Sequence, residues 1–311
     1  MKKDLLTIAD LSRNEIVDIL DLADKVKKYP SKYANRLQGK TLLMMFEKPS
    51  LRTRISFEVG MTQLGGHAIY YDLSTSPLGK NKESIYDTAM TACRYVDIIM
   101  ARLFSHQVIT DLAKNSRAPV INALTDYSHP CQILGDLQTI RERRGKLGGL
   151  KVAYFGDGNN NVTHSLLFGC SILGMNISVA CPKGPDFEPN ADVVKKATQF
   201  AEKSGSKIEI TNNAKTAIKD ADVVYTDSWM SYHIPENLKQ ERMNIFMPFQ
   251  VNNELMKLAK KNVIFLHCLP ATRGMEMTAD VIDGPYSAVF DEAENRLHVQ
   301  KAVMLRLLKS D

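Results

Sequence analysis

Short apolar runs alternate with helical segments along most of the chain, and this alternation restricts the fold more than any other feature. A capping box from Ser12 to Glu15 opens the first helical segment, which has apolar residues at helical spacing behind it. The apolar runs of strand length that follow in the first half of the sequence cover residues 41–46, 68–71, 97–101 and 119–122. Repeated strand-helix units of this kind predict a parallel sheet.

A second series of the same kind follows a charged helical stretch at residues 132–144 and three nearby glycines. Its strands are expected at residues 151–155, 177–180, 207–210, 223–226 and 263–266. A length of 311 residues fits about two domains. We therefore expect an α/β fold with two doubly wound parallel-sheet domains, residues 1–147 and 148–311, joined by a bridging helix.

Composition narrows the class of protein. Hydrophobic residues make up 44% and charged residues 24%, which is typical of a folded globular chain. The net charge of +5 is spread along the sequence, so nucleic acid is not an expected partner. The five cysteines are odd in number and include no Cys-x-x-Cys, which argues against a disulfide framework or zinc ribbon and favours the cytoplasm. No apolar stretch approaches about 20 residues, so a membrane is not expected as a partner.

The first segment that indicates chemistry follows the apolar run at 41–46. Ser50 can cap the helix that begins there, and the free N–H groups at a helix N-terminus favour anions. Arg52 and Thr53 add a guanidinium and a hydroxyl suited to phosphate oxygens. A capped surface helix with solvated arginines is the alternative.

The second segment is His129-Pro130-Cys131-Gln132, after the fourth expected strand. A residue before proline is conformationally restricted, so the His129 ring can be aimed at a carbonyl or phosphate oxygen. Gln132 lies one helical turn further on. Arg102, after the third expected strand, would bring a cation to the same sheet edge. An ordinary turn is the alternative for the His-Pro pair.

Later strand ends carry groups suited to an amino acid. The segment 156–161 lacks the third glycine of a dinucleotide loop, and its asparagines instead offer neutral donors and acceptors. Asp227 could pair with a substrate ammonium or cap a helix. His267 and Cys268 are adjacent on an expected strand and would point to opposite faces, so His267 is not expected to act as the base for Cys268. The spacing of histidines and cysteines fits no usual zinc site, and we expect no metal.

In their order along the chain these segments resemble the aspartate/ornithine carbamoyltransferase family. Ser50-Leu51-Arg52-Thr53-Arg54 is similar to the family's Ser-Thr-Arg-Thr-Arg signature for carbamoyl phosphate, and His129-Pro130-Cys131-Gln132 matches its His-Pro-x-Gln. His267-Cys268-Leu269-Pro270 resembles the ornithine branch. Glu294-Asn295-Arg296 resembles a C-terminal motif whose arginine reaches back to carbamoyl phosphate. The resemblance covers essentially the whole chain.

The resemblance implies a role for each matching residue. The catalytic set would be Arg102, His129, Gln132, Asp227 and Cys268. Carbamoyl phosphate would be bound by Ser50, Leu51, Arg52, Thr53, Arg102, His129, Gln132, Cys268, Leu269 and Arg296. L-Ornithine would be bound by Asn161, Asp227, Ser231 and Tyr232, with Asn160 an alternative to Asn161.

The implied reaction transfers the carbamoyl group of carbamoyl phosphate to the δ-amino group of L-ornithine, giving L-citrulline and phosphate in arginine biosynthesis. No cofactor is implied, because carbamoyl phosphate is already activated. The active site is expected in the cleft between the domains, with the last helix packed back on the first domain. The resemblance also implies a homotrimer or a multiple of trimers, in which a neighbour's loop at Ser74–Ser84, with Lys80 and Lys82, covers the site; neither lysine is assigned a role.

Two other functions stay open on the sequence alone. Tyr232-His233 replaces the Met-Gly of the ornithine-branch pattern, which leaves putrescine as an alternative acceptor. A non-catalytic sensor of carbamoyl phosphate or an amino acid is the second alternative, although a sensor has no need of groups for both reacting halves.

Overall fold

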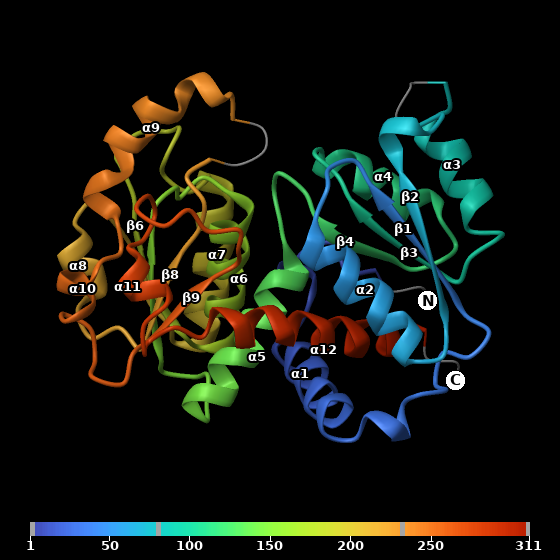
Figure 1. Ribbon diagram of the computed structural model, residues 1–311, viewed down its shortest axis with the longest axis horizontal. Coiled ribbons are helices and arrows are strands. Elements are labelled where there is room, and N and C mark those ends of the chain that lie inside the picture. The colour runs from blue at the N-terminus through green and yellow to red at the C-terminus, as the bar shows by residue number, and fades with distance from the viewer. Residues whose placement is uncertain (1–3, 79–81, 231–233, 309–311) are drawn as a thin grey trace. The chain divides into compact units, whose positions relative to one another are not determined.

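Two parallel sheets form the framework of the chain (Figure 1). The computed structural model describes residues 4–78, 82–230 and 234–308. The chain divides into two units, of which unit 1 holds residues 1–138 with 294–311 and unit 2 holds residues 139–293. Both sheets confirm the predicted α/β class.

Unit 1 contains a four-stranded sheet in the order β2-β1-β3-β4, with all strands parallel. Its strands are β1 (Thr41–Phe46), β2 (His67–Asp72), β3 (Ile98–Arg102) and β4 (Val120–Leu124). The inner strand β3 is buried along its whole length, whereas the edge strand β2 is largely exposed. This pattern is the expected result of covering a parallel sheet with helices while leaving an edge uncovered.

The long helices of unit 1 begin where local sequence signals favour a helix. Helix α1 starts with the predicted capping box, in which the Glu15 amide donates to Ser12 Oγ and the Ser12 amide donates to the Glu15 carboxylate. Its apolar stripe is buried, as the spacing predicts. The helices are α1 (Arg13–Lys28), α2 (Leu51–Gln63), α3 (Ile85–Ala92) and α4 (His106–Asn115), with short 3-10 turns at Ile8–Asp10, Pro30–Lys32 and Leu73–Thr75.

Unit 2 contains a five-stranded parallel sheet in the order β7-β6-β5-β8-β9. Its strands are β5 (Lys151–Phe155), β6 (Asn176–Ala180), β7 (Ile208–Thr211), β8 (Val223–Thr226) and β9 (Ile264–His267). The three central strands β5, β6 and β8 are almost entirely buried, and β5 and β8 carry continuous apolar runs. Such runs are typical of strands covered on both faces.

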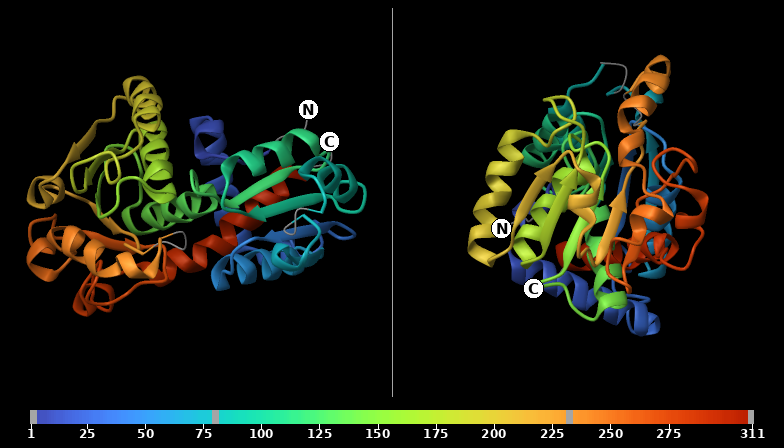
Figure 2. Two further views of the ribbon diagram at one scale, coloured as in Figure 1. Left: turned by 90° about the horizontal axis from the view of Figure 1, so that it is seen from above. Right: turned by 90° about the vertical axis from the view of Figure 1, so that its left-hand side faces the viewer.

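Helices lie on both sides of this second sheet (Figure 2). The long pair α6 (Asn161–Leu173) and α7 (Ala191–Ser204) pack against each other, and each ends at a glycine in the left-handed conformation. Buried apolar residues of three shorter helices pack with those of β5, β8 and β9 in one core cluster. These shorter helices are α8 (Ala214–Ile218), α10 (Asn253–Met256) and α11 (Ala279–Ile282); α9 (Lys239–Phe246) lies between 3-10 turns at Glu236–Leu238 and Met247–Phe249.

The chain passes between the units inside two helices. Helix α5 (Pro130–Arg144) begins in unit 1 and ends in unit 2, and α12 (Val289–Leu307) begins in unit 2 and ends in unit 1. Most of the last helix is therefore part of the first unit, while the domain boundary at 147/148 stays a prediction. No helix in the described residues is long and apolar enough to cross a membrane.

Candidate active site

The predicted phosphate segment lies at the switch point of the unit 1 sheet. Strands β1 and β3 are neighbours, but the chain continues from β1 to β2 on one side and from β3 to β4 on the other. In open parallel sheets, ligands bind beyond the carboxyl ends of the strands at such a point. Residues 47–54 follow β1, and Arg102 is the last residue of β3.

Helix α2 begins at this point with the predicted cap. The Thr53 amide donates to Ser50 Oγ at 3.2 Å, so the first turn of the helix is held in place by its own cap. Leu51 is 69% exposed, which limits its contribution to the site to its backbone. Arg52 is half-buried in the same turn. The positive end of the helix therefore lies beside a cation, as an anion site requires.

Two buried arginines converge on the Thr53 hydroxyl from other elements. Arg102 Nη1 donates to Thr53 Oγ1 at 3.5 Å, and Arg296 Nη2 of α12 donates to the same oxygen at 3.4 Å. Gly135 of α5 leaves room for this arrangement, because a Cβ at that position would lie 3.1 Å from Arg296 Cδ. The expected return of Arg296 to the phosphate segment is thus found within unit 1.

Gln132 connects this arginine to a carboxylate. Its side-chain oxygen accepts from Arg296 Nη1 at 2.6 Å, and its Nε2 donates to Asp136 Oδ1 at 2.8 Å. Both Gln132 and Asp136 are buried. Gln132 therefore orients the Arg296 guanidinium, and its expected contact with the ligand stays a prediction.

His129 is buried beside the same cations. Burial lowers the pKa of its imidazole well below the usual value, and the positive charges of Arg296 and Arg102, followed by those of Lys48 and Arg52, lower it further. The ring is consequently neutral at physiological pH and can donate a hydrogen bond without adding charge.

Sequence reasoning assigned no role to Lys48, although it lies inside the predicted phosphate segment. Its side chain is buried, and its ammonium lies 4.3 Å from the centroid of the Phe104 ring. Burial, followed by the charge of Arg102, lowers its pKa to about 8. The residue adds a further cation to this half-site, which we call the cation cluster: Lys48, Arg52, Arg102 and Arg296.

Unit 2 has its own switch point between β5 and β8, and polar residues follow both strands. After β5, Asn160 caps α6 by accepting from the Thr163 amide at 2.8 Å, and its Nδ2 donates to the Tyr154 hydroxyl at 2.9 Å. The carboxamide of Asn160 is therefore used within the loop. Asn161, half-exposed at the first position of α6, is the better candidate for a substrate contact.

Asp227 and Cys268 meet at the ends of β8 and β9. The Cys268 thiol donates to Asp227 Oδ1 at 2.9 Å, and the Ser228 amide donates to the same oxygen at 2.7 Å. Asp227 is only 9% exposed, and this burial raises the pKa of its carboxyl. A carboxylate held at low exposure beside a thiol is suited to receive a substrate amine.

The side chain of His267 fixes the turn after β9. Its Nδ1 accepts from the Leu269 amide at 2.8 Å, and its Nε2 lies 3.3 Å from Glu276 Oε1. Leu269 has a positive φ of 56°, which a local hydrogen bond of this kind helps to maintain. His267 points away from the thiol toward Glu276, so it does not serve as a base for Cys268, as the strand geometry predicts.

A second connection in unit 2, which the sequence did not indicate, joins α9 to the loop after β5. Arg242 Nη2 lies 2.6 Å from Asp157 Oδ2, and Arg242 Nε donates to the Trp229 carbonyl at 2.7 Å. Both side chains are mostly buried. The pair therefore fixes the loop that leads to Asn161 relative to the segment that follows Asp227.

Some predicted positions fall where the structure gives no description. Ser231, Tyr232 and His233 lie outside the described residues, as does Lys80 of the expected covering loop. In the ranges 4–78, 82–230 and 234–308, no group of three or more histidine, cysteine, aspartate or glutamate side chains is arranged to hold a metal ion.

The fold and the cation cluster define the class: a parallel α/β protein with several cationic side chains gathered at a sheet switch point. Models of the aspartate/ornithine carbamoyltransferase carbamoyl phosphate-binding domain and Asp/Orn-binding domain match residues 3–142 and 148–307. The chain belongs to the aspartate/ornithine carbamoyltransferase family.

Individual relatives are similar over nearly the whole chain. An ornithine carbamoyltransferase of Thermococcus kodakarensis is 53% identical over 97% of this chain and 95% of its own. The solved ornithine carbamoyltransferase of Pyrococcus furiosus superposes with a TM-score of 0.93 at 50% identity, covering 97% of this chain and 96% of its own. That of Giardia lamblia gives 0.91 at 42% identity, covering 100% and 99%.

Proposed function

We propose that this chain is an ornithine carbamoyltransferase, which transfers the carbamoyl group of carbamoyl phosphate to the δ-amino group of L-ornithine. The observation that carries the proposal is the convergence of buried Arg102 and Arg296 on Thr53 at the N-terminus of α2. Such a concentration of fixed positive charge suits a ligand with a dianionic phosphate. The relatives at about 50% identity, named for ornithine, support that acceptor.

The first half of the proposed mechanism concerns carbamoyl phosphate. Ser50, Leu51, Arg52 and Thr53 bind the phosphate at the helix N-terminus. Arg102 and His129 polarise the carbamoyl carbonyl and stabilise the negative charge that develops on its oxygen. Arg296 binds the same ligand, and Gln132 contributes through its hydrogen bond to Arg296.

The second half concerns the amine. Asn161 holds the α-carboxylate or α-amino group of ornithine, and Asp227 orients the δ-amine together with Ser231 and Tyr232. Cys268 and Leu269 lie at the carbamoyl group. The neutral δ-amine forms a C–N bond to the carbonyl carbon, the C–O bond to phosphate breaks, and the leaving phosphate takes the proton that the amine loses. The products are L-citrulline and phosphate.

We further propose a homotrimer or a multiple of trimers. Support comes from exposed apolar side chains on α2 and β2. Ile55 and Val59 of α2 are exposed by 51% and 37%, and Tyr70 of β2 by 37%. We call these three residues the α2/β2 surface. The cytoplasmic location and the role in arginine biosynthesis stay predictions.

The deciding experiment offers L-ornithine, putrescine and L-aspartate separately to the purified protein with carbamoyl phosphate. Phosphate release is measured and the carbamoylated product is identified by mass. Citrulline formed fastest supports the proposal. Faster carbamoylputrescine would assign the diamine as substrate, and no product with any amine would favour a sensor.

A matched pair of variants tests the phosphate half-site. Arg52→Ala should lower kcat/KM for carbamoyl phosphate by at least about 100-fold, because a charge-assisted contact to phosphate is lost in a partly buried site. Arg36→Ala, which changes an exposed arginine of the same unit, should leave it unchanged. Near-normal turnover of Arg52→Ala would contradict the assignment.

A further inference from the structure

Unit 1 contains a pocket at the opposite end of α2 from the proposed phosphate site. Its volume is about 540 Å³, and it is formed by the end of α1 with the turn after it, the end of α2, and α12. Figure 1 shows these three helices in unit 1. The 13 residues of α2 span roughly 20 Å, so the pocket lies well away from Ser50. The polar side chains that line it are Lys27, Tyr33, Gln63, Glu294, His298 and Lys301.

Lys301 is the most deeply buried charged group in this pocket. Its side chain is only 2% exposed, and its stem crosses α2 at Gly60, where a Cβ would lie 3.3 Å from Lys301 Cγ. Its ammonium donates to the side-chain oxygen of Gln63 at 2.8 Å. Among the described residues, that neutral amide is the one hydrogen-bond partner of the ammonium. Buried lysines are normally paired with an anion, so this pairing is incomplete.

His298, one helical turn before Lys301, has an unused ring nitrogen. The side chain is 9% exposed, its Nε2 lies 3.2 Å from Glu294 Oε1, and its Nδ1 is buried without a hydrogen-bond partner in the described part of the chain. Burial lowers the pKa of the ring, and the charges of Lys301 and Lys27 lower it further. The pocket therefore holds two adjacent buried polar groups with unmet hydrogen-bonding capacity: an ammonium that can donate, and a neutral ring whose Nδ1 can only accept.

The balance of charge shows which ligand would meet that capacity. Lys27 Nζ donates to Asn295 Oδ1 at 2.9 Å and lies 3.6 Å from Glu294 Oε1. Glu294 is thus shared between Lys27 and His298, and its side chain is 55% exposed. The pocket has two lysines against one largely exposed carboxylate, so its interior favours an anion.

We propose that this pocket binds a small oxyanion, a phosphate or a carboxylate, with the Lys301 ammonium as its principal contact. The volume accommodates a ligand of this size with ordered water around it. Because α12 carries the pocket residues Glu294, His298 and Lys301 and also Arg296 of the cation cluster, the ligand would bind a helix that contributes to both sites.

Equilibrium dialysis with radiolabelled inorganic phosphate and, separately, radiolabelled succinate tests the proposal on the full chain. Arg52→Ala serves as the background, because it weakens the other proposed phosphate site. One phosphate or one succinate should bind per chain in this background, and none should bind when Lys301→Met is added. Adding Lys28→Met instead, at an exposed position on α1, should leave binding intact.

The measurements with phosphate and with succinate show which kind of oxyanion the pocket binds. Loss of phosphate binding alone identifies a phosphate ligand, and loss of succinate binding alone identifies a carboxylate. Equal binding of both anions with and without Lys301→Met would overturn the proposal. Lys301→Gln, which keeps a polar group, replaces Lys301→Met if circular dichroism shows that the methionine variant is unfolded, and the same loss of binding is expected.

Discussion

The imidazole of His129 lies in a setting where a charged histidine is strongly disfavoured. Four cationic side chains and complete burial all act in the same direction on its pKa. The proposed chemistry benefits from this, because a neutral ring stays an oriented donor over the whole range in which carbamoyl phosphate would bind. The same setting also affects folding.

The first prediction concerns stability at low pH. The folded-state pKa of His129 is lowered, so below about pH 6.5 the unfolded chain binds a proton that the folded chain does not. Stability should therefore be unaffected above that pH and fall below it, by up to about 1.4 kcal/mol per pH unit from this residue. Urea unfolding at pH 7.5 and 5.5 should show a smaller loss for His129→Asn than for the parent chain. Equal losses in both would contradict this.

Cys268 and Asp227 give the second prediction. Cys268→Ala removes the thiol that donates to Asp227 Oδ1, so the carboxylate loses one of the groups that fix it. We expect kcat/KM for ornithine to fall at least about tenfold. Cys268→Ser keeps a donor and should retain more activity. Steady-state kinetics with ornithine varied checks both variants, and an unchanged kcat/KM for ornithine in Cys268→Ala would contradict the role of the thiol in holding Asp227.

At the scale of elements, Arg242 shows how one short helix controls a loop. It binds Asp157 of the loop after β5 and the Trp229 carbonyl after β8, and its guanidinium lies 4.8 Å from the centroid of the Phe246 ring. The loop itself has little room to move. A Cβ on Gly158 would lie 2.7 Å from the Phe187 carbonyl oxygen, so only glycine fits there.

The third prediction follows from this connection. Arg242→Met leaves Asp157 without its buried partner and should raise KM for ornithine by about tenfold, with KM for carbamoyl phosphate unchanged. Arg242→Lys should recover part of the loss, because a lysine can still pair with Asp157 but cannot donate to the Trp229 carbonyl in the same way. Arg273→Met breaks an exposed ion pair with Asp283 in the same unit and serves as the control. An unchanged ornithine KM in Arg242→Met would show that the pair only stabilises the fold.

Elements differ in how well the sequence predicts them. Each described strand overlaps one of the predicted apolar runs. The apolar signature is strongest in the inner strands, which are buried on both faces, and weaker in the edge strands β2 and β7, which are partly exposed. Helices α8, α10 and α11 were not predicted, since four or five residues are too few to display a helical period.

The residues of the candidate site also differ in how well the sequence predicts them. Polar residues at strand ends are visible in the sequence, because the topology brings strand ends to one edge. The bond between Arg296 and Thr53 joins residues 243 positions apart, and the family resemblance, not the local residue pattern, predicted that Arg296 returns to this segment. The burial of Lys48 and the pairing of Arg242 with Asp157 escaped prediction, because no local pattern reports them.

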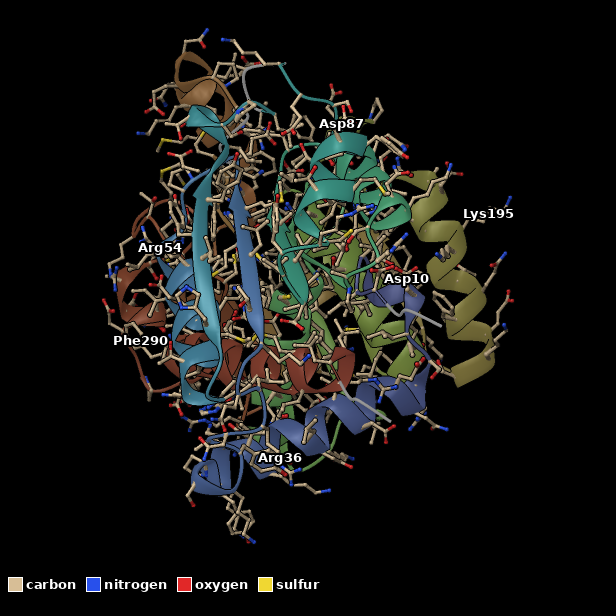
Figure 3. All side chains as sticks on the ribbon, turned by 90° about the vertical axis from the view of Figure 1, so that its right-hand side faces the viewer. Asp10, Arg36, Arg54, Asp87, Lys195 and Phe290 are labelled. Carbon is tan, nitrogen blue, oxygen red and sulfur yellow. The ribbon has the colours of Figure 1, made fainter. Side chains whose placement is uncertain are left out.

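At the scale of the whole molecule, the α2/β2 surface is where we propose that chains associate. Figure 3 shows Arg54 beside β2, and its guanidinium lies 4.0 Å from the centroid of the Tyr70 ring on that strand. An exposed edge strand with apolar neighbours is a liability for a monomer, and burial in an oligomer removes it.

The fourth prediction tests that surface. Ile55→Glu places a charge at its centre without disfavouring the helix, and it should lower the molar mass measured by light scattering from that of a trimer or larger assembly toward that of one chain. Tyr95→Glu, at a position 79% exposed elsewhere in unit 1, should leave the mass unchanged. A monomeric parent chain, or an Ile55→Glu assembly of unchanged mass, would contradict the proposed interface.

The discontinuity of unit 1 has a consequence for the order in which the protein is made. Residues 1–138 leave the ribosome well before residues 294–308, which supply the rest of that unit, whereas unit 2 is a single stretch. At ordinary rates of synthesis the delay is roughly ten to thirty seconds. During that time the contacts of Thr53 and Gln132 with Arg296 cannot form, and the buried faces of α1 and α2 cannot pack against α12. Unit 2 can therefore complete its folding before unit 1. Unit 1 is then the part of the chain that chaperones have reason to bind.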